Sequence, residues 1–185
     1  MRVCQIVSTI KQFGQLDGAA KIAGVYDYPT SELWHEQRGI EKWDHVIGVN
    51  LTGAANCLHV ELEHMASAAA STGRKASQVK IAYYREHRYI ASKHGNIGLT
   101  KALAKEYGPV GININAVAPG AIDTPMNANV GREVGDKLVA AIPIPRRGTA
   151  EETAKLIVFL LSEDASYITG ATYTVDGGMT QYDEE

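Results

Sequence analysis

The chain has 185 residues, a net charge of −3 and 45% hydrophobic residues, so one domain with a sizeable core is expected. This balance argues against a basic nucleic-acid-binding surface, and two cysteines outside any CxxC pair argue against a zinc site or a disulfide framework. No stretch approaches the ~18 apolar residues of a membrane-spanning helix, and the cysteine usage fits a cytoplasmic, reducing location.

Helical and strand patterns alternate along the chain. The predicted elements are, in order, a helix over 3–13 ended by Gly14, a short strand within 16–25, a loop over 26–39, a long helix over 39–71, a polar break at 72–78, a weak strand over 79–84, a helix over 87–107, a strand over 111–120, a loop region with room for one short helix over 121–148, a helix over 149–162 and a strand over 171–178. Thr149 and Glu152 match a capping box. Such alternation predicts an α/β fold with a parallel sheet.

The segment RYIASKHG, residues 88–95, places Tyr89 four residues before Lys93. On a helix the two side chains share a face, so they form either a surface pair worth a few tenths of a kcal/mol or an acid tuned by an ammonium group. A free tyrosine has a pKa near ~10, and a neighbouring positive charge lowers that pKa toward neutral pH. Taken alone, the pair favours the surface interpretation.

Three further motifs accompany the pair in a fixed order: VNLTG at 49–53, NAVAPGAIDTPM at 115–126 and VDGG at 175–178. Together with YIASK they make residues 14–179 resemble the short-chain dehydrogenase/reductase family, most closely its fungal members tied to secondary metabolism. The resemblance implies a Rossmann-type parallel sheet with flanking helices. It also implies an NAD(P)-dependent oxidoreductase for a small-molecule carbonyl or secondary alcohol, with NADP or NAD as cofactor.

The resemblance assigns catalytic roles to four residues. Tyr89 would be the proton donor, and Lys93 would tune it and bind the nicotinamide ribose. Asn50 would hold a water in a proton relay, the alternative being a satisfied buried asparagine that bends its helix. Counting back from Tyr89 to the place of the family's serine reaches Ala76, so the adjacent Ser77 is the candidate oxyanion donor, with a surface-loop serine as the alternative.

The resemblance also implies a cofactor site. Its residues would be Gly24, Tyr89, Lys93, Pro119, Gly120, Ile122 and Thr124. A tight turn at Pro119 and Gly120 lets backbone approach a ligand at the carboxyl end of a strand. The backbone of Ile122 and the hydroxyl of Thr124 would hold the nicotinamide carboxamide, and Gly24 would lie near the adenine-side ribose.

The sequence departs from the family at its start. No TGxxxGxG turn, which binds pyrophosphate in the family, precedes residue 14. We therefore interpret residues 1–185 as a single partial domain without the first three strands and without the residue that selects NAD or NADP. The alternative function is a non-catalytic remnant, or a truncated gene product that cannot bind cofactor alone. Lys21 replaces a family asparagine, either protecting an open strand edge or lying near the pyrophosphate.

Other patterns carry weaker functional hypotheses. His59 and Glu63 are spaced for one helix face but lack a third ligand, so we expect a solvated surface and no metal. The YYREHR segment at 83–88 is more consistent with a loop or strand end than with a nucleic-acid contact. The apolar faces of the helices at 40–66 and 87–107 belong either to the core or, as in the family, also to a homo-oligomer interface. We expect no nucleic-acid or membrane partner.

Overall fold

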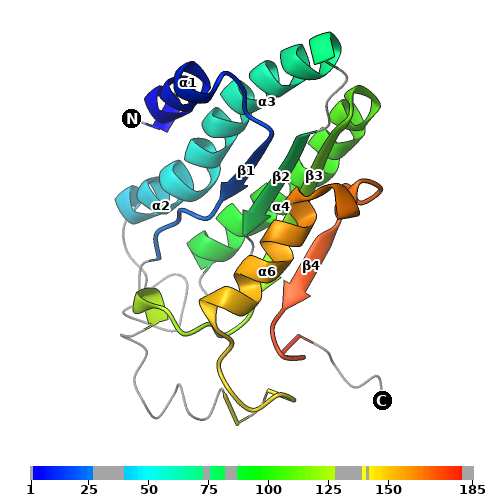
Figure 1. The fold of residues 1–185 in the computed structure, drawn as a ribbon. Helices are drawn as coiled ribbons and strands as arrows, with labels where there is room; N and C mark the ends of the chain where they lie inside the picture. Colours follow the sequence, from blue (N-terminus) through cyan, green and yellow to red (C-terminus); the bar gives the residue numbers. More distant parts are fainter. Residues whose placement is uncertain are drawn as a thin grey trace.

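In the part of the chain that the structure describes, the sheet has four parallel strands in the order β1-β2-β3-β4, which confirms the predicted α/β class (Figure 1). The strands are β1 Gly18–Lys21, β2 Ala76–Ile81, β3 Ile112–Pro119 and β4 Thr172–Val175. The computed structural model describes residues 2–26, 40–72, 76–81, 87–127, 139–140 and 142–180. Residues 27–39 of the predicted loop at 26–39, and part of the predicted loop region at 121–148, lie outside the described residues.

Helices cover both faces of this sheet. They are α1 Arg2–Phe13, α2 Ile40–Ile47, α3 Gly53–Thr72, α4 His87–Tyr107 and α6 Ala150–Leu161, with short 3₁₀ turns at Gly108–Val110, Pro125–Asn127 and Glu163–Ala165. Helices α3 and α4 lie on one face of the sheet and α6 on the other (Figure 1). Ile112 and Ile114 of β3 pack against α3 and α4, whereas Val117 packs on the other face against α6. Alternate side chains of β3 therefore supply two cores, as expected for a parallel strand buried on both faces.

Two helix ends follow the local sequence. Gly14 ends α1 with a φ of 81°, and its N–H donates to the carbonyl oxygen of Ile10 at 2.8 Å. At the start of α6, the Thr149 hydroxyl accepts a hydrogen bond from the N–H of Glu152, whose carboxylate accepts one from the N–H of Thr149. The predicted capping box is therefore confirmed.

The long helix predicted over 39–71 is interrupted between α2 and α3. Gly48–Thr52 forms a π-helical turn, in which the N–H of Gly53 donates to the carbonyl oxygen of Gly48. Asn50 is buried in this turn with 2% of its surface exposed. Asparagine is a poor helix former because its side chain competes for backbone hydrogen bonds. The α-helix is therefore interrupted at Asn50, a residue whose low helix propensity is evident from the sequence.

Strand β2 begins at Ala76, earlier than the strand predicted over 79–84, so the predicted polar break was wrong over its last residues. The reason is that the polar side chains at the start of the strand form hydrogen bonds inside the protein. The Ser77 hydroxyl donates to the carbonyl oxygen of Leu160 at 2.6 Å, and the Gln78 amide donates to a methionine sulfur. Satisfied polar groups can be buried at little cost, so this strand extends beyond its apolar pattern.

Lys21 ends the edge strand β1 and is neutralised within the protein. Its ammonium forms an ion pair with Glu61 of α3 and donates a hydrogen bond to the Gln78 side chain. The two charged side chains are only 11% and 8% exposed. A buried charge requires an oppositely charged partner, and for Lys21 that partner is Glu61 of α3. Neither interpretation of the sequence named this residue.

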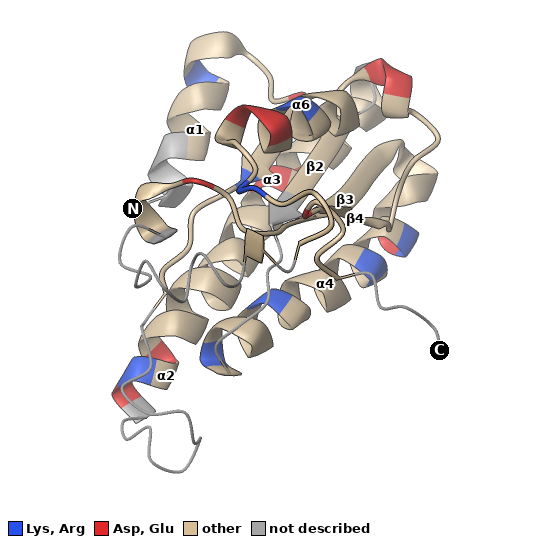
Figure 2. Cartoon of the chain, turned by 90° about the horizontal axis from the view of Figure 1, so that it is seen from below, with Lys and Arg blue, Asp and Glu red and all other residues tan. Residues whose placement is uncertain are grey.

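Charges of both signs are spread over the helices (Figure 2). Glu151 and Glu152 open α6, whereas the last turn of α4 carries Lys105. This mixture differs from the clustered basic surface typical of nucleic-acid-binding proteins. Among the described residues, no helix has the length and apolar character to cross a membrane.

Candidate active site

Tyr89 and Lys93 lie in the first two turns of α4. Their residues are 6% and 3% exposed, and Nζ of Lys93 lies 5.0 Å from the centroid of the Tyr89 ring. Tyr26, which follows β1, packs edge-to-face on the Tyr89 ring with centroids 5.5 Å apart. This burial is inconsistent with the exposed surface pair that the two residues, taken without the other motifs, favour.

Burial also sets the charge state of Lys93. Desolvation lowers the pKa of its ammonium from 10.5 to about 8. In the described parts of the chain, no carboxylate forms an ion pair with it. The ammonium is therefore protonated at neutral pH but loses its proton at a much lower pH than an exposed lysine.

A cavity of about 470 Å³ opens beside the pair. Every residue predicted to bind the cofactor lines it, namely Gly24, Tyr89, Lys93, Pro119, Gly120, Ile122 and Thr124. The remaining lining residues are mostly apolar and come from the end of β1, the segment after β3 and α6. The cavity therefore lies at the carboxyl edge of the sheet, where α/β proteins bind ligands.

The turn after β3 packs against the VDGG segment. The N–H of Gly120 donates to the carbonyl oxygen of Val175 at 2.9 Å. A Cβ at Gly120 would lie 2.6 Å from the backbone of Asp176, a distance that real contacts do not reach. The close approach therefore requires glycine at position 120. It brings the NAVAPGAIDTPM motif into contact with the VDGG motif next to the cavity.

The loop that carries Ile122 is held by Gly148. The N–H of Gly148 donates to the carbonyl oxygen of Ala121, and the N–H of Asp123 donates to that of Gly148, both at 2.9 Å. This parallel bridge joins the loop to the segment before α6, and Ile122, which lines the cavity, lies within it. The predicted carboxamide contacts therefore lie on an ordered segment.

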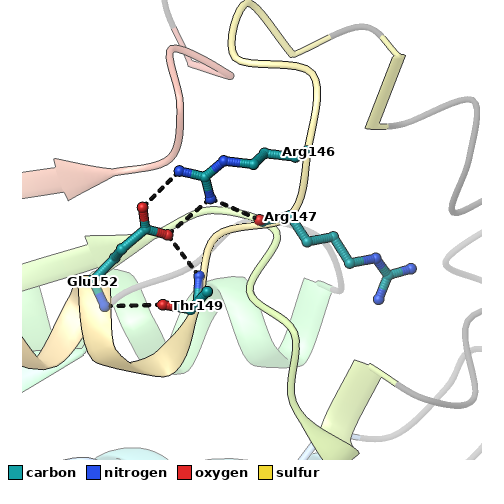
Figure 3. A network of polar contacts seen from close by, with 4 residues as sticks. All are labelled: Arg146, Arg147, Thr149 and Glu152. Carbon is teal, nitrogen blue, oxygen red and sulfur yellow. Dashed lines mark hydrogen bonds and ion pairs between the residues drawn. The ribbon is translucent and has the colours of Figure 1, made fainter.

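The side chain of Glu152 is hydrogen-bonded to Arg146 and Thr149, which lie before and after Gly148 in the sequence (Figure 3). The guanidinium of Arg146 donates to both oxygens of the Glu152 carboxylate, at 2.9 and 2.6 Å, and to the carbonyl oxygen of Arg147. The same carboxylate accepts the N–H of Thr149 at 2.8 Å. The hydrogen bonds from Arg146 and Thr149 lower the pKa of Glu152 to about 2.

The Asn50 side chain is hydrogen-bonded within the protein at both its oxygen and its nitrogen. Its Oδ1 accepts the N–H of Val25 at 2.8 Å, and its Nδ2 donates to the carbonyl oxygen of Val25 at 2.9 Å and to the hydroxyl of Ser92 at 3.2 Å. The structure therefore shows the satisfied, buried asparagine that was the alternative interpretation. The relay role stays a prediction. The Oδ1 of Asn50 has a second lone pair, which leaves it able to accept a hydrogen bond from a water molecule.

The structure does not bring Ser77 together with Tyr89. Ser77 lies near the amino end of β2, about 13 Å of strand from its carboxyl end at Ile81, and its hydroxyl is bonded to the end of α6. Counting back from the tyrosine misplaces the serine because only residues 82–86 join β2 to α4. Ser77 is therefore a buried strand residue rather than the surface-loop serine considered in the sequence, and it does not line the cavity. Its role as oxyanion donor stays a prediction.

Three residues near the site were not identified from the sequence. Thr153 of α6 lines the cavity, and its buried hydroxyl has no hydrogen-bond partner among the described residues. Ser92 and Asn96 are buried on α4 and contact Asn50. Their spacing of four residues on a buried helix face is the sequence signal that could have revealed them.

No cluster of metal ligands is found in the part of the chain that the structure describes. His59 and Glu63, the pair considered in the sequence, are both exposed on α3. Their exposure agrees with a solvated helix face.

A parallel α/β sheet with a buried tyrosine–lysine pair at its carboxyl edge is the arrangement of a Rossmann-type oxidoreductase. Comparison with known proteins supports this class. A family model described as enoyl-(acyl carrier protein) reductase matches residues 3–180. The short-chain dehydrogenase/reductase aba4 of Botryotinia fuckeliana is 37% identical over 179 residues, covering 94% of this chain and 69% of the relative. The chain belongs to the short-chain dehydrogenase/reductase family.

Other relatives agree with this assignment. A cyclohexanol dehydrogenase from an Acinetobacter species is 38% identical, covering 92% of this chain and 66% of the relative. Among solved structures, levodione reductase superposes with a TM-score of 0.85 at 33% identity, covering 97% of this chain and 73% of its own. The chain thus matches these proteins almost throughout and spans about two-thirds to three-quarters of their length.

Proposed function

We propose that this chain is an NAD(P)-dependent oxidoreductase that reduces a carbonyl group or oxidises a secondary alcohol. The observation that carries the proposal is the buried Tyr89–Lys93 pair, in the wall of a cavity that all the predicted cofactor-binding residues line. Family membership supports the reaction class. The carbonyl or secondary alcohol substrate and the cofactor class, NADP or NAD, rest on the sequence resemblance.

Tyr89 is the proposed acid–base group. In reduction its phenol donates a proton to the carbonyl oxygen as negative charge develops there, and in oxidation the phenolate accepts the proton of the alcohol. The ammonium of Lys93, 5.0 Å from the ring centroid, stabilises the phenolate. The mostly apolar cavity strengthens this attraction because it lowers the local dielectric constant.

The residues present fit the nicotinamide half of the cofactor. The buried ammonium of Lys93 is a donor for ribose hydroxyl groups, and Thr124 is a donor for the carboxamide. Gly24 leaves the space that this requires, since a Cβ there would come within 3.4 Å of Lys93 Nζ and 3.2 Å of Asn50 Oδ1. When bound, the nicotinamide supplies or accepts the hydride.

The lining of the cavity favours an apolar substrate. Met126 and Ile157 contribute apolar side chains beside the proposed acid. Because one relative is named a cyclohexanol dehydrogenase, cyclohexanone and cyclohexanol are suitable first probes. A part in fungal secondary metabolism rests on the fungal wording of the sequence, which the Botryotinia fuckeliana relative supports.

A second candidate is a chain that keeps the pair but does not bind the cofactor by itself. The observation that favours it is the lack of a TGxxxGxG turn in the sequence, because that turn supplies backbone donors to the pyrophosphate. Binding of the complete dinucleotide therefore separates the two candidates.

The test is a fluorescence titration of the purified chain with NADPH and NADH, followed by turnover with the two cyclohexyl probes. We expect micromolar binding of at least one nucleotide. Tyr89→Phe should keep that binding and lower turnover by about 10²–10⁴-fold, while Lys93→Met should weaken the binding itself. Lys101→Met, on an exposed part of the same helix, is the matched control. Absence of binding to both nucleotides contradicts the proposal and favours the second candidate.

A further inference from the structure

A side-chain amide joins the π-helical turn to α4. Asn96, 4% exposed, donates from Nδ2 to the carbonyl oxygen of Asn50 at 2.9 Å and to that of Ser92 at 3.2 Å. The two helices approach closely beside it, since a Cβ at Gly95 would lie 2.8 Å from the Leu51 side chain. The contact between the turn and α4 is therefore tight as well as hydrogen-bonded.

The orientation of this amide follows from its partners. Both are carbonyl oxygens, which only accept, so the NH₂ group of Asn96 must face them. Its Oδ1 is then left buried with no partner among the described residues, and an unsatisfied buried acceptor is destabilising. A leucine of similar size would avoid that cost. The favourable contribution of Asn96 therefore lies in its donor, which reaches the turn.

The π-helical turn also holds the segment that follows β1 beside Lys93. Asn50 binds both backbone groups of Val25, and a Cβ at the adjacent Gly24 would lie 3.2 Å from Asn50 Oδ1 and 3.4 Å from Lys93 Nζ, so the Gly24 backbone lies next to both. A chain of contacts therefore runs from Asn96 through the turn to the backbone beside the ammonium. Of the described residues that line the cavity, Tyr89 is the only other titratable one, and burial is the cause of the lowered Lys93 pKa.

We propose that Asn96 is a positioning residue: its amide holds the π-helical turn so that Asn50 keeps Gly24 and Val25, which follow β1, packed beside Lys93. It contacts neither the proposed cofactor site nor the proposed acid directly. The inference extends the proposed function, because it assigns to Asn96 control over the surroundings of the Tyr89–Lys93 pair. The contacts of Asn96 and Asn50 that it invokes are made between protein atoms and need no bound cofactor.

The test compares Asn96→Leu with wild type by NMR. One readout is the pH titration of the Lys93 side chain, assigned by its loss in Lys93→Met. The other is the hydrogen exchange rate of the Val25 amide, whose N–H is bound by Asn50 and not by the altered residue. We expect the Lys93 pKa to rise from about 8 toward 10.5, because water enters, and Val25 exchange to accelerate about tenfold or more.

The matched control is Thr100→Val, which removes another buried hydrogen bond of α4, from the Thr100 hydroxyl to the carbonyl oxygen of Asn96, without touching the turn. It should leave both readouts unchanged. Asn96→Ala serves as the second variant in case leucine disrupts folding. Changes in Asn96→Leu or Asn96→Ala no larger than those in the control would overturn the proposal. Because neither readout requires a nucleotide, failure of the proposed function would not imitate this result.

Discussion

Lys93 should destabilise the fold at neutral pH, and replacing it should make the protein more stable. Its residue is 3% exposed and the pKa of its ammonium falls from 10.5 to about 8. Lowering a pKa by one pH unit corresponds to about 1.4 kcal/mol, so burying the charge costs about 3 kcal/mol. Lys93→Met removes the charge and retains an unbranched side chain of similar length. We therefore expect this variant to gain up to about 3 kcal/mol at pH 7 while losing activity.

The pH dependence distinguishes this explanation from a general packing effect. Between pH 8 and 10.5 the unfolded chain still holds the lysine proton that the folded chain has lost, so the stability of the wild type rises with pH through this interval. The advantage of Lys93→Met should therefore shrink as pH rises. The difference between wild type and variant isolates this effect from other groups that titrate in the same interval.

Urea unfolding of both proteins, from about pH 7 to pH 10.5, provides the measurement. Lys101→Met is the control, since Lys101 is exposed on the same helix and its replacement should give a small difference that stays constant with pH. The reasoning is refuted if Lys93→Met is no more stable than the wild type at pH 7. It is equally refuted if the difference is the same at both ends of the range.

Three further predictions concern the surroundings of the cavity. Gly120→Ala places a methyl group 2.6 Å from the Asp176 backbone and should destabilise the fold by about 1–3 kcal/mol in thermal unfolding; an unchanged melting temperature would contradict that contact. Ser77→Ala should cost about 1 kcal/mol in urea unfolding through its lost hydrogen bond to α6 and leave nucleotide affinity unchanged, whereas a loss of turnover without a loss of stability would restore its catalytic role. Glu152, whose pKa is lowered from 4.5 to about 2, contributes stability above pH 4.5 that is lost as pH falls toward 2. Glu152→Gln should lose less stability than the wild type between pH 4.5 and 2, and identical acid-unfolding curves would exclude a stabilising ion pair between Glu152 and Arg146.

Local patterns were sufficient to predict much of the fold. Gly14 and Thr149 mark helix ends through the chemistry of their own backbone neighbourhoods, and strand–helix alternation gives the parallel sheet. That Tyr89 and Lys93 share a helix face could be predicted for the same reason, since one helical turn suffices to bring the two side chains together. Their assignment to a site depended on the other motifs and the family resemblance.

Contacts between distant segments could not be predicted in this way. Asn50 meets Val25 and Asn96 across 25 and 46 residues, and no periodicity encodes such partners. The start of β2 was missed because Ser77 looks like a loop residue until its partner, 83 residues away, is known. The misplaced serine came from assuming a fixed spacing between a strand and a helix that residues 82–86 alone connect.

The π-helical turn has a consequence for how this helix tolerates insertions and deletions. Such a turn contains one residue more than the α-helix it interrupts. Deleting a single residue from Gly48–Thr52 would therefore restore a regular helix and keep α2 and α3 in phase, whereas a deletion elsewhere would rotate one helix against its neighbours by about 100°. If the deleted residue is Asn50, the irregularity and the amide that binds Val25 disappear in one step. A change of one residue in length would thus keep a continuous helix while removing its hydrogen bonds to the segment that follows β1.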